Sequence, residues 1–161
     1  MGIKERYRGP AGKILPSLSL DLEEALNRLN RLFATKQVAL AYLFGSYAAG
    51  TNDLSSDLDL AVLMADQKNQ DKKLYLQLFS AIQQTLSTER FDLLNLDDAS
   101  PLMKMEIVRS GRIIYARTED ELNNFEMKTI QEYLDTAYLR KVQNNYLKKR
   151  VEHWYSEKKA Y

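Results

Sequence analysis

Runs of apolar residues alternate along the chain with stretches in which apolar residues recur at every third or fourth position. The first kind of pattern is typical of β-strands and the second of amphipathic helices, because side chains repeat with a period of two or of 3.6. The runs predict four strands, over residues 38–44, 57–64, 90–96 and 112–116. The helical spacings predict helices over residues 20–35, from residue 68 to 86, and over 101–108.

Local signals predict where two of these helices begin. Ser19 is expected to be the N-cap of the first helix, with Glu23 in the first turn. Ser100 is expected to cap the last, with Pro101 at its first position and Gly111 after its end. Helices interleaved with strands in this order predict an α+β fold. We expect a small mixed β-sheet backed by helices, with a functional site at one edge of the sheet.

The two ends of the chain differ from this central region. Residues 1–18 hold two of the three prolines and several glycines, which predicts an irregular or flexible N-terminal arm. The tail after residue 116 is charged, free of glycine and proline, and carries apolar residues at helical spacing, which predicts one or two helices. We therefore divide the chain into an arm (1–18), a domain (19–116) and a C-terminal helical extension (117–161).

Composition limits the classes of protein that this chain can belong to. Its 161 residues suffice for one domain with a substantial core, and a net charge of +1 gives no strong signal for nucleic-acid binding. The absence of cysteine excludes disulfides, thiolate zinc sites and a cysteine nucleophile, and His153 is the sole histidine. No apolar run approaches the roughly 18 residues of a membrane span. We expect a cytoplasmic protein that does not associate with membranes.

The chemistry-bearing motif is a Gly-Ser pair followed, after ten residues, by an Asp-x-Asp triplet. Gly45 and Ser46 follow the first apolar run, and Asp57 and Asp59 stand at the start of the second. Two carboxylates at positions i and i+2 of a strand point to the same face, where they can bind one hard cation or a close pair. A glycine lets the backbone approach a ligand closely, and the serine hydroxyl with nearby amides can hold a phosphate.

This motif resembles the signature of the nucleotidyltransferase superfamily related to DNA polymerase beta. The short spacer and the Ser-Asp-x-Asp-Leu sequence are most similar to the minimal, MNT-type antitoxins that pair with HEPN-domain toxins. The resemblance covers roughly residues 20–116 and implies a polymerase-beta-type palm. It also implies ATP as substrate and two Mg²⁺ ions held by Asp57 and Asp59. Gly45 and Ser46 would bind the β and γ phosphates, and the chain would form a hetero-oligomer with a cognate HEPN-domain toxin.

Asp92 is the candidate for a third carboxylate. It is one acid in an otherwise apolar strand, where a charge needs a cation, a partner or solvent. In the resembling family a third acid on a neighbouring strand binds metal and takes the proton of the attacking hydroxyl, which implies both roles for Asp92. The alternative is an edge-strand aspartate that faces water. Asp97 and Asp98 are weaker candidates because they follow the strand and are expected to start the next helix.

One position departs from the pattern of the resembling family. Many relatives carry an arginine or lysine just before the second glycine of the turn, whereas this chain has Ala49 there. Another cation would then have to contact the triphosphate, and the candidates are Lys13, Lys104 and Arg109. The sequence does not rank them, and the departure leaves open a protein that binds nucleotide without turning it over.

The group that accepts the nucleotide is open to three interpretations. The chain could be an antitoxin that transfers AMP to a tyrosine hydroxyl of its HEPN toxin, a transferase that modifies a small molecule such as an antibiotic, or a non-catalytic antitoxin that acts by binding alone. Its small size favours the first and third, because drug-modifying relatives add a sizeable helical domain.

The C-terminal tail is rich in tyrosine and, from residue 138, in Lys and Arg. It could bind a protein partner or RNA, or pack its apolar stripe on the domain.

Overall fold

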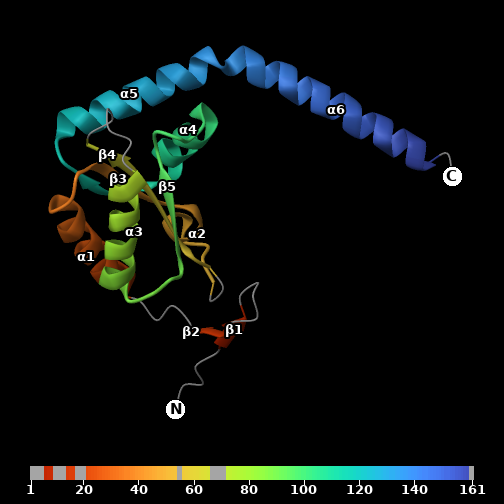
Figure 1. Ribbon diagram of the computed structural model, residues 1–161. Helices are drawn as coiled ribbons and strands as arrows, with labels where there is room; N and C mark the ends of the chain where they lie inside the picture. Colours follow the sequence, from red (N-terminus) through yellow and green to blue (C-terminus); the bar gives the residue numbers. More distant parts are fainter. Residues whose placement is uncertain (1–5, 9–13, 17–20, 54–55, 66–71, 160–161) are drawn as a thin grey trace.

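The computed structural model describes residues 6–8, 14–16, 21–53, 56–65 and 72–159. Its centre is a four-stranded mixed sheet in the order β5-β4-β3-β6. The strands are β3 (Val38–Phe44), β4 (Leu58–Met64), β5 (Phe91–Asn95) and β6 (Arg112–Ala116). β3 pairs antiparallel with both β4 and β6, while β4 and β5 run parallel. The predicted α+β fold with a small mixed sheet is confirmed (Figure 1).

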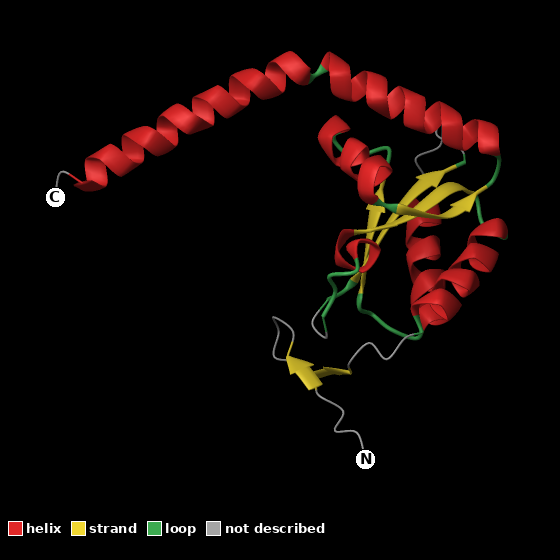
Figure 2. Ribbon diagram, turned by 180° about the vertical axis from the view of Figure 1, so that it is seen from behind, coloured by secondary structure: helices red, strands yellow, loops and turns green. Residues whose placement is uncertain are grey.

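Helices cover both faces of this sheet (Figure 2). On one face lie α1 (Leu22–Ala34) and α3 (Lys72–Leu86), which pack on each other and share a core with alternate residues of β3 and β4 such as Leu43 and Leu60. On the other face lie α4 (Pro101–Ser110) and α5 (Glu119–Asp135), whose core includes Tyr42 and Ala61. The alternation of the two cores along β3 and β4 follows from the period of two in a strand.

Two local expectations for the domain need correction. The N-cap of α1 is Asp21, whose carboxylate accepts hydrogen bonds from the backbone N–H groups of Glu23 and Glu24, whereas Ser19 lies outside the described residues. The Gly-Ser segment forms a short helix, α2 (Gly45–Ala49), where we expected a simple turn. Ser100 and Pro101 begin α4 as predicted: the Ser100 hydroxyl accepts from the backbone N–H of Met103.

The N-terminal segment is more regular than its proline and glycine content predicts. β1 (Arg6–Arg8) and β2 (Ile14–Pro16) form a separate antiparallel pair. These residues form strands where we expected irregular structure, and the flexibility of the arm stays a prediction. A strand pairing of this kind depends on contacts between segments, which local composition does not reveal.

The C-terminal tail consists of α5 and the longer helix α6 (Ala137–Lys159). α5 packs on α4 and β3, but α6 projects away from the rest of the molecule (Figure 1). Of the one or two helices that the sequence predicts, the tail forms two. The interpretation in which it packs its apolar stripe on the domain holds for α5 and not for α6. Among the described helices, including this 23-residue one, none combines the length and apolarity required to cross a bilayer.

Candidate active site

The Gly-Ser motif and the Asp-x-Asp motif meet where β3 and β4 pair. Phe44, the last residue of β3, lies opposite Asp59 of β4, and Gly45 follows with a φ of +68°. A Cβ placed on Gly45 would overlap Oδ2 of Asp59 and would lie 2.9 Å from its Cγ. Two constraints therefore require glycine here, the left-handed backbone and the carboxylate packed directly against it. Ser46 lies next to this contact, on the first turn of α2.

Asp59 and Asp92 are register partners on the parallel strands β4 and β5. Partners in a parallel ladder point to the same face, so both carboxylates lie on one side of the sheet. Burial first, and then the charges of Asp92 and Asp57, raise the pKa of Asp59 above its ordinary value. The third acid expected from the sequence is thus within electrostatic reach of the Asp-x-Asp motif. Asp92 is also exposed on an edge strand, as the alternative interpretation supposed.

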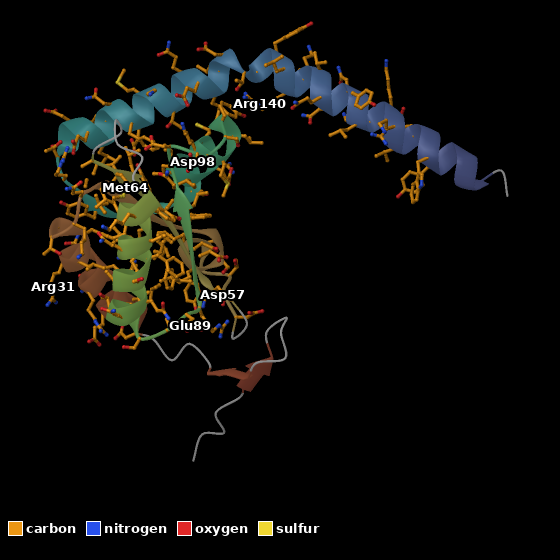
Figure 3. All side chains as sticks on the ribbon, in the orientation of Figure 1. Arg31, Asp57, Met64, Glu89, Asp98 and Arg140 are labelled. Atoms are coloured by element: carbon orange, nitrogen blue, oxygen red, sulfur yellow. The ribbon has the colours of Figure 1, made fainter. Side chains whose placement is uncertain are left out.

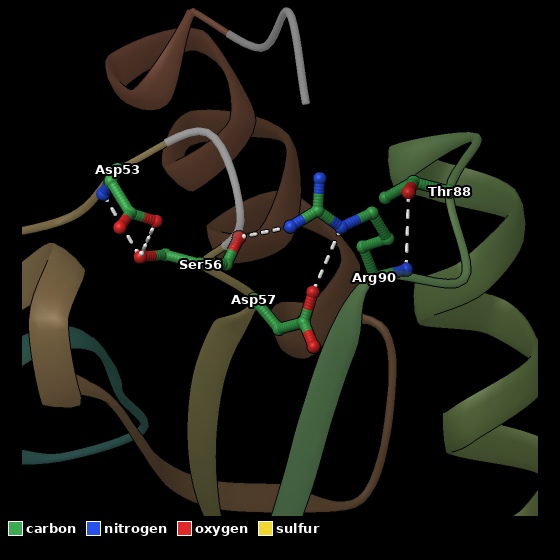
Figure 4. A network of polar contacts seen from close by, with 5 residues as sticks. All are labelled: Asp53, Ser56, Asp57, Thr88 and Arg90. Atoms are coloured by element: carbon green, nitrogen blue, oxygen red, sulfur yellow. Dashed lines mark hydrogen bonds and ion pairs between the residues drawn. The ribbon is translucent and has the colours of Figure 1, made fainter. Parts of the chain in front are cut away.

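Asp57 precedes β4 and binds a buried arginine. Arg90, whose side chain is only 2% exposed, donates from Nε to Oδ1 of Asp57 at 2.9 Å and from Nη2 to the carbonyl oxygen of Ser56 at 2.8 Å (Figure 4). The backbone N–H of Leu58 donates to the carbonyl oxygen of Arg90 at 3.2 Å. These bonds join the loop before β4 to the start of β5 and fix the position of one motif carboxylate.

A second set of hydrogen bonds joins Asp53 to Ser56, just before the Asp-x-Asp motif. The Ser56 hydroxyl donates to Oδ1 of Asp53 at 3.1 Å and accepts from the backbone N–H of Asp53 at 2.9 Å (Figure 4). The backbone N–H of Ser56 also donates to the carbonyl oxygen of Asp53 at 3.1 Å. Hydrogen bonds of this kind, from Asp and Ser side chains to nearby backbone groups, are typical of turns.

The two described candidates for the basic residue missing at position 49, Arg109 and Lys104, lie at opposite ends of the sheet. α4 ends at the same end of the sheet as the motif, because a Cβ on Gly111 would lie 3.1 Å from the carbonyl oxygen of Leu43. Arg109 is in the last turn of α4 and pairs with Glu106. Lys104 instead lines a cavity of about 320 Å³ together with Met64 and Asp97. Lys13 lies outside the described residues.

This cavity is at the far end of the sheet. Figure 3 shows Asp57 and Glu89 at one end of β4 and β5, and Met64 and Asp98 at the other. Asp97 lines the cavity, and Asp98 accepts a hydrogen bond from Nδ2 of Asn95 at 2.9 Å. Both acids lie in the turn before α4, which begins at Pro101, so they do not start the helix as we expected. Arg109 is therefore the better-placed candidate of the two described cations.

Arg90 is the residue of this site that the sequence analysis missed. An arginine at the start of a largely apolar segment gives one usable signal, since a buried guanidinium requires an anionic or carbonyl partner. The sequence could not identify the partner, because Asp57 is 33 residues away.

The carboxylates of Asp59 and Asp92 could hold a hard cation if the phosphates of a substrate supplied its other ligands. Within the described part of the chain, no three or more His, Cys, Asp or Glu side chains lie close enough to hold a metal by themselves. Magnesium usually takes one or two protein carboxylates and completes its shell with water and substrate phosphates. Asp59 and Asp92 supply two carboxylates side by side, and a bound cation would relieve the repulsion between their negative charges. The donor set therefore fits Mg²⁺.

The fold and the motif define a nucleotidyltransferase palm, and comparison with known families agrees. Residues 27–120 match the family described as "Polymerase beta, Nucleotidyltransferase", a match that spans more than half of the chain. The chain belongs to this family and is a nucleotidyltransferase.

Two curated relatives share one description, "Protein adenylyltransferase MntA". The chain is 34% identical to the protein of Shewanella oneidensis over 97 residues, which are 60% of this chain and 67% of the relative. It is 22% identical to the protein of Aphanizomenon flos-aquae over 151 residues, which are 87% of this chain and 96% of the relative.

Solved structures of toxin–antitoxin complexes resemble the chain as well. A structure described as a toxin-antitoxin with AMP-PNP has a TM-score of 0.62 and 29% identity, covering 76% of this chain and 98% of that one. A second contains a tri-AMPylated HEPN toxin of Shewanella oneidensis in complex with an MNT antitoxin. Its TM-score is 0.59 and its identity 26%, over 78% of this chain and 98% of that one. About a fifth to a quarter of this chain therefore lies outside each likeness.

Proposed function

We propose that this chain is the antitoxin of a toxin–antitoxin pair and transfers AMP from ATP to a tyrosine hydroxyl of a HEPN-domain toxin, which neutralises the toxin. The observation that carries the proposal is the contact of Gly45 with Asp59 beside the in-register Asp92. The names and complexes of the relatives supply the acceptor. The proposal includes a cytoplasmic location, because ATP is an intracellular nucleotide.

The residues divide the work of phosphoryl transfer among them. Asp59 and Asp92 would hold Mg²⁺ together with the triphosphate, and Asp57 would join them through its second carboxylate oxygen once the nucleotide is bound. The ion would neutralise charge on the triphosphate and on the attacking oxygen. Gly45 and Ser46 would lie along the β and γ phosphates, where the missing Cβ leaves room for a close approach. Arg109, in the last turn of α4, would exchange its ion pair with Glu106 for the triphosphate and so supply the positive charge that Ala49 does not.

Asp92 is our candidate for the general base. Its exposure leaves room for an incoming hydroxyl, and its register with Asp59 places it beside the nucleotide site. The tyrosine oxygen would attack the α-phosphorus while Asp92 accepts the phenolic proton. The bond from the α-phosphorus to the bridging oxygen would break, and pyrophosphate would leave. No covalent enzyme intermediate is needed.

Intact-mass spectrometry tests the proposal. The purified chain is incubated with its HEPN-domain partner, ATP and Mg²⁺, and the toxin is expected to gain the mass of one or more AMP units. Asp92→Asn should reduce transfer far more than it reduces ATP binding measured by calorimetry, because the amide keeps the shape but cannot accept the proton. Asp98→Asn, a change of the same chemistry at the far end of the sheet, is the control and should leave both unchanged.

Two outcomes would contradict the proposal in different ways. If the Asp59→Asn protein inhibits the toxin fully while the toxin stays unmodified, the chain acts by binding alone. If ATP is consumed with Mg²⁺ but AMP appears on a small hydroxyl compound and never on the toxin, the acceptor class is wrong and the nucleotidyl transfer stands.

A further inference from the structure

The helix α6 exposes many large apolar side chains to solvent. Each of its side chains that the structure describes is exposed except that of Arg140, which is half-buried. The large apolar members of this surface are Tyr138, Leu139, Val142, Tyr146, Leu147, Val151, Trp154 and Tyr155, each at least 48% exposed. Most helical stability in proteins comes from packing an apolar face on another element, and beyond its junction with α5 this 23-residue helix has no such packing in the described chain.

α5 presents a second uncovered apolar stripe. Its inner side, including Phe125, packs against β3 and α4, but Met127, Ile130 and Leu134 are 70%, 42% and 63% exposed. Their spacing of three and four residues places them along one side of the helix. Two apolar helical surfaces therefore follow one another along residues 119–159. We call this segment the C-terminal arm, which is distinct from the N-terminal arm of residues 1–18.

The two helices of this arm carry opposite charge. α5 has six carboxylates and one lysine, whereas α6 has seven Lys or Arg residues and two glutamates. Three of the acids of α5 already have partners in the described chain, in Glu121 with Arg117, Glu126 with Tyr42, and Glu132 with Lys104. Glu119, Asp120 and Asp135 remain exposed. Each helix is thus complementary to the other in charge as well as in apolar character.

The junction between the helices prevents them from satisfying each other within one chain. Only Thr136 separates α5 from α6, whereas an antiparallel pair of helices needs a connection of roughly 2–5 residues. Thr136 donates from its hydroxyl to the carbonyl oxygen of Glu132 at 2.9 Å and accepts from Nη1 of Arg140. The Arg140 guanidinium also lies 3.7 Å from the centre of the Tyr133 ring. These contacts brace the arm in its extended form.

We propose that two copies of this chain form a dimer in which the α6 helix of each copy packs on the α5 helix of the other. Two arms laid antiparallel about a two-fold axis place the basic α6 of each copy on the acidic α5 of the other. The same contact forms twice, as a two-fold interface requires. α6 is roughly 34 Å long at 1.5 Å per residue, long enough to cover the exposed side of α5. The family match ends at residue 120, so this interface belongs to the part of the chain outside it.

A charge-exchange experiment tests the dimer with the full chain. One variant reverses α6 (Lys141→Glu, Lys148→Glu, Lys149→Glu) and a second reverses α5 (Glu119→Lys, Asp120→Lys, Asp135→Lys). In light scattering after size-exclusion chromatography at micromolar concentration, the unaltered chain should be a dimer. Each variant alone should be a monomer, because its α5 and α6 then carry charge of the same sign. An equimolar mixture should restore a dimer that contains one copy of each, since both of its contacts are again between opposite charges.

The matched control reverses three cations of α1 and its end (Arg28→Glu, Arg31→Glu, Lys36→Glu), which changes the net charge of the chain by the same amount as the α6 variant does. This control should remain dimeric, and circular dichroism should show that every variant is folded. A monomeric unaltered chain, variants that both stay dimeric, or a mixture that does not pair would each overturn the proposal. If the monomer instead captures the HEPN toxin or RNA through α6, the arm belongs to that partner. None of these results affects the test of AMP transfer.

Discussion

Arg90 donates to Asp57 at 2.9 Å, and the guanidinium of this pair is almost fully buried while the carboxylate is about half exposed. The first acid of the Asp-x-Asp motif therefore has a structural role in addition to the role in binding metal that we propose. It neutralises the charge of Arg90, next to the start of β5, and so ties Ser56 and Asp57 to the neighbouring strand.

The first prediction concerns this pair. Asp57→Ala should lower the free energy of unfolding by about 1–3 kcal/mol, because it leaves a buried guanidinium with fewer partners. Asp57→Asn, which keeps an oxygen to accept from Arg90, should cost less. Urea unfolding followed by circular dichroism measures both. An Ala variant as stable as the unaltered chain would show that water replaces Asp57 at no cost.

The second prediction concerns the pH dependence that Asp59 contributes. Burial and the neighbouring carboxylates raise the pKa of Asp59 in the folded state, so its ionised form weakens the fold. Without Mg²⁺, Asp59→Asn should stabilise the protein at neutral pH by about 0.5 kcal/mol, in the range for like charges on neighbouring strands.

The sign of this effect fixes its pH profile. The folded state retains the proton of Asp59 to a higher pH than the unfolded chain does, so the penalty grows as pH rises from the ordinary pKa of aspartate to the raised one. The advantage of Asp59→Asn should shrink as pH falls through this window and vanish below it. Urea unfolding at several pH values checks this, and a difference that grows toward low pH would contradict it.

The third prediction compares two glycines with the same backbone conformation. Gly45 and Gly50 both have a φ of +68°, but only Gly45 has a side chain packed where a Cβ would stand. Both substitutions by alanine should cost about 1–2 kcal/mol for the left-handed backbone. Gly45→Ala should cost about 1–3 kcal/mol more for overpacking against Asp59 and should abolish ATP binding measured by calorimetry. Equal effects at the two sites would disprove the contact.

The fourth prediction separates the candidate cations. Arg109→Gln should weaken Mg²⁺-dependent ATP binding about tenfold, the value of one charge-assisted hydrogen bond. Lys104→Gln should leave ATP binding unchanged, because Lys104 lines the cavity at the far end of the sheet and pairs with Glu132 at 3.2 Å. Calorimetry on both variants decides between them. A loss at Lys104 alone would reverse the assignment.

The elements that the sequence determined are those whose pattern is local. β3 and β6 have the predicted bounds, because each is a continuous run of strand-forming residues between polar breaks. The beginning of α4 also agrees with prediction, since Ser100 and Pro101 act within one helical turn. The Gly-Ser and Asp-x-Asp motifs were visible for the same reason, as a fixed spacing between two apolar runs.

Tertiary structure decided everything that depends on residues far apart in the chain. The register that places Asp92 beside Asp59 comes from strand pairing, and the ion pair between Arg90 and Asp57 spans 33 residues. Whether α6 packs on its own domain was equally undetermined, because an apolar stripe indicates that a helix is covered but not by which surface. The free energies of such contacts depend on which residues lie close together in three dimensions, and a pattern along the sequence does not show which residues these are.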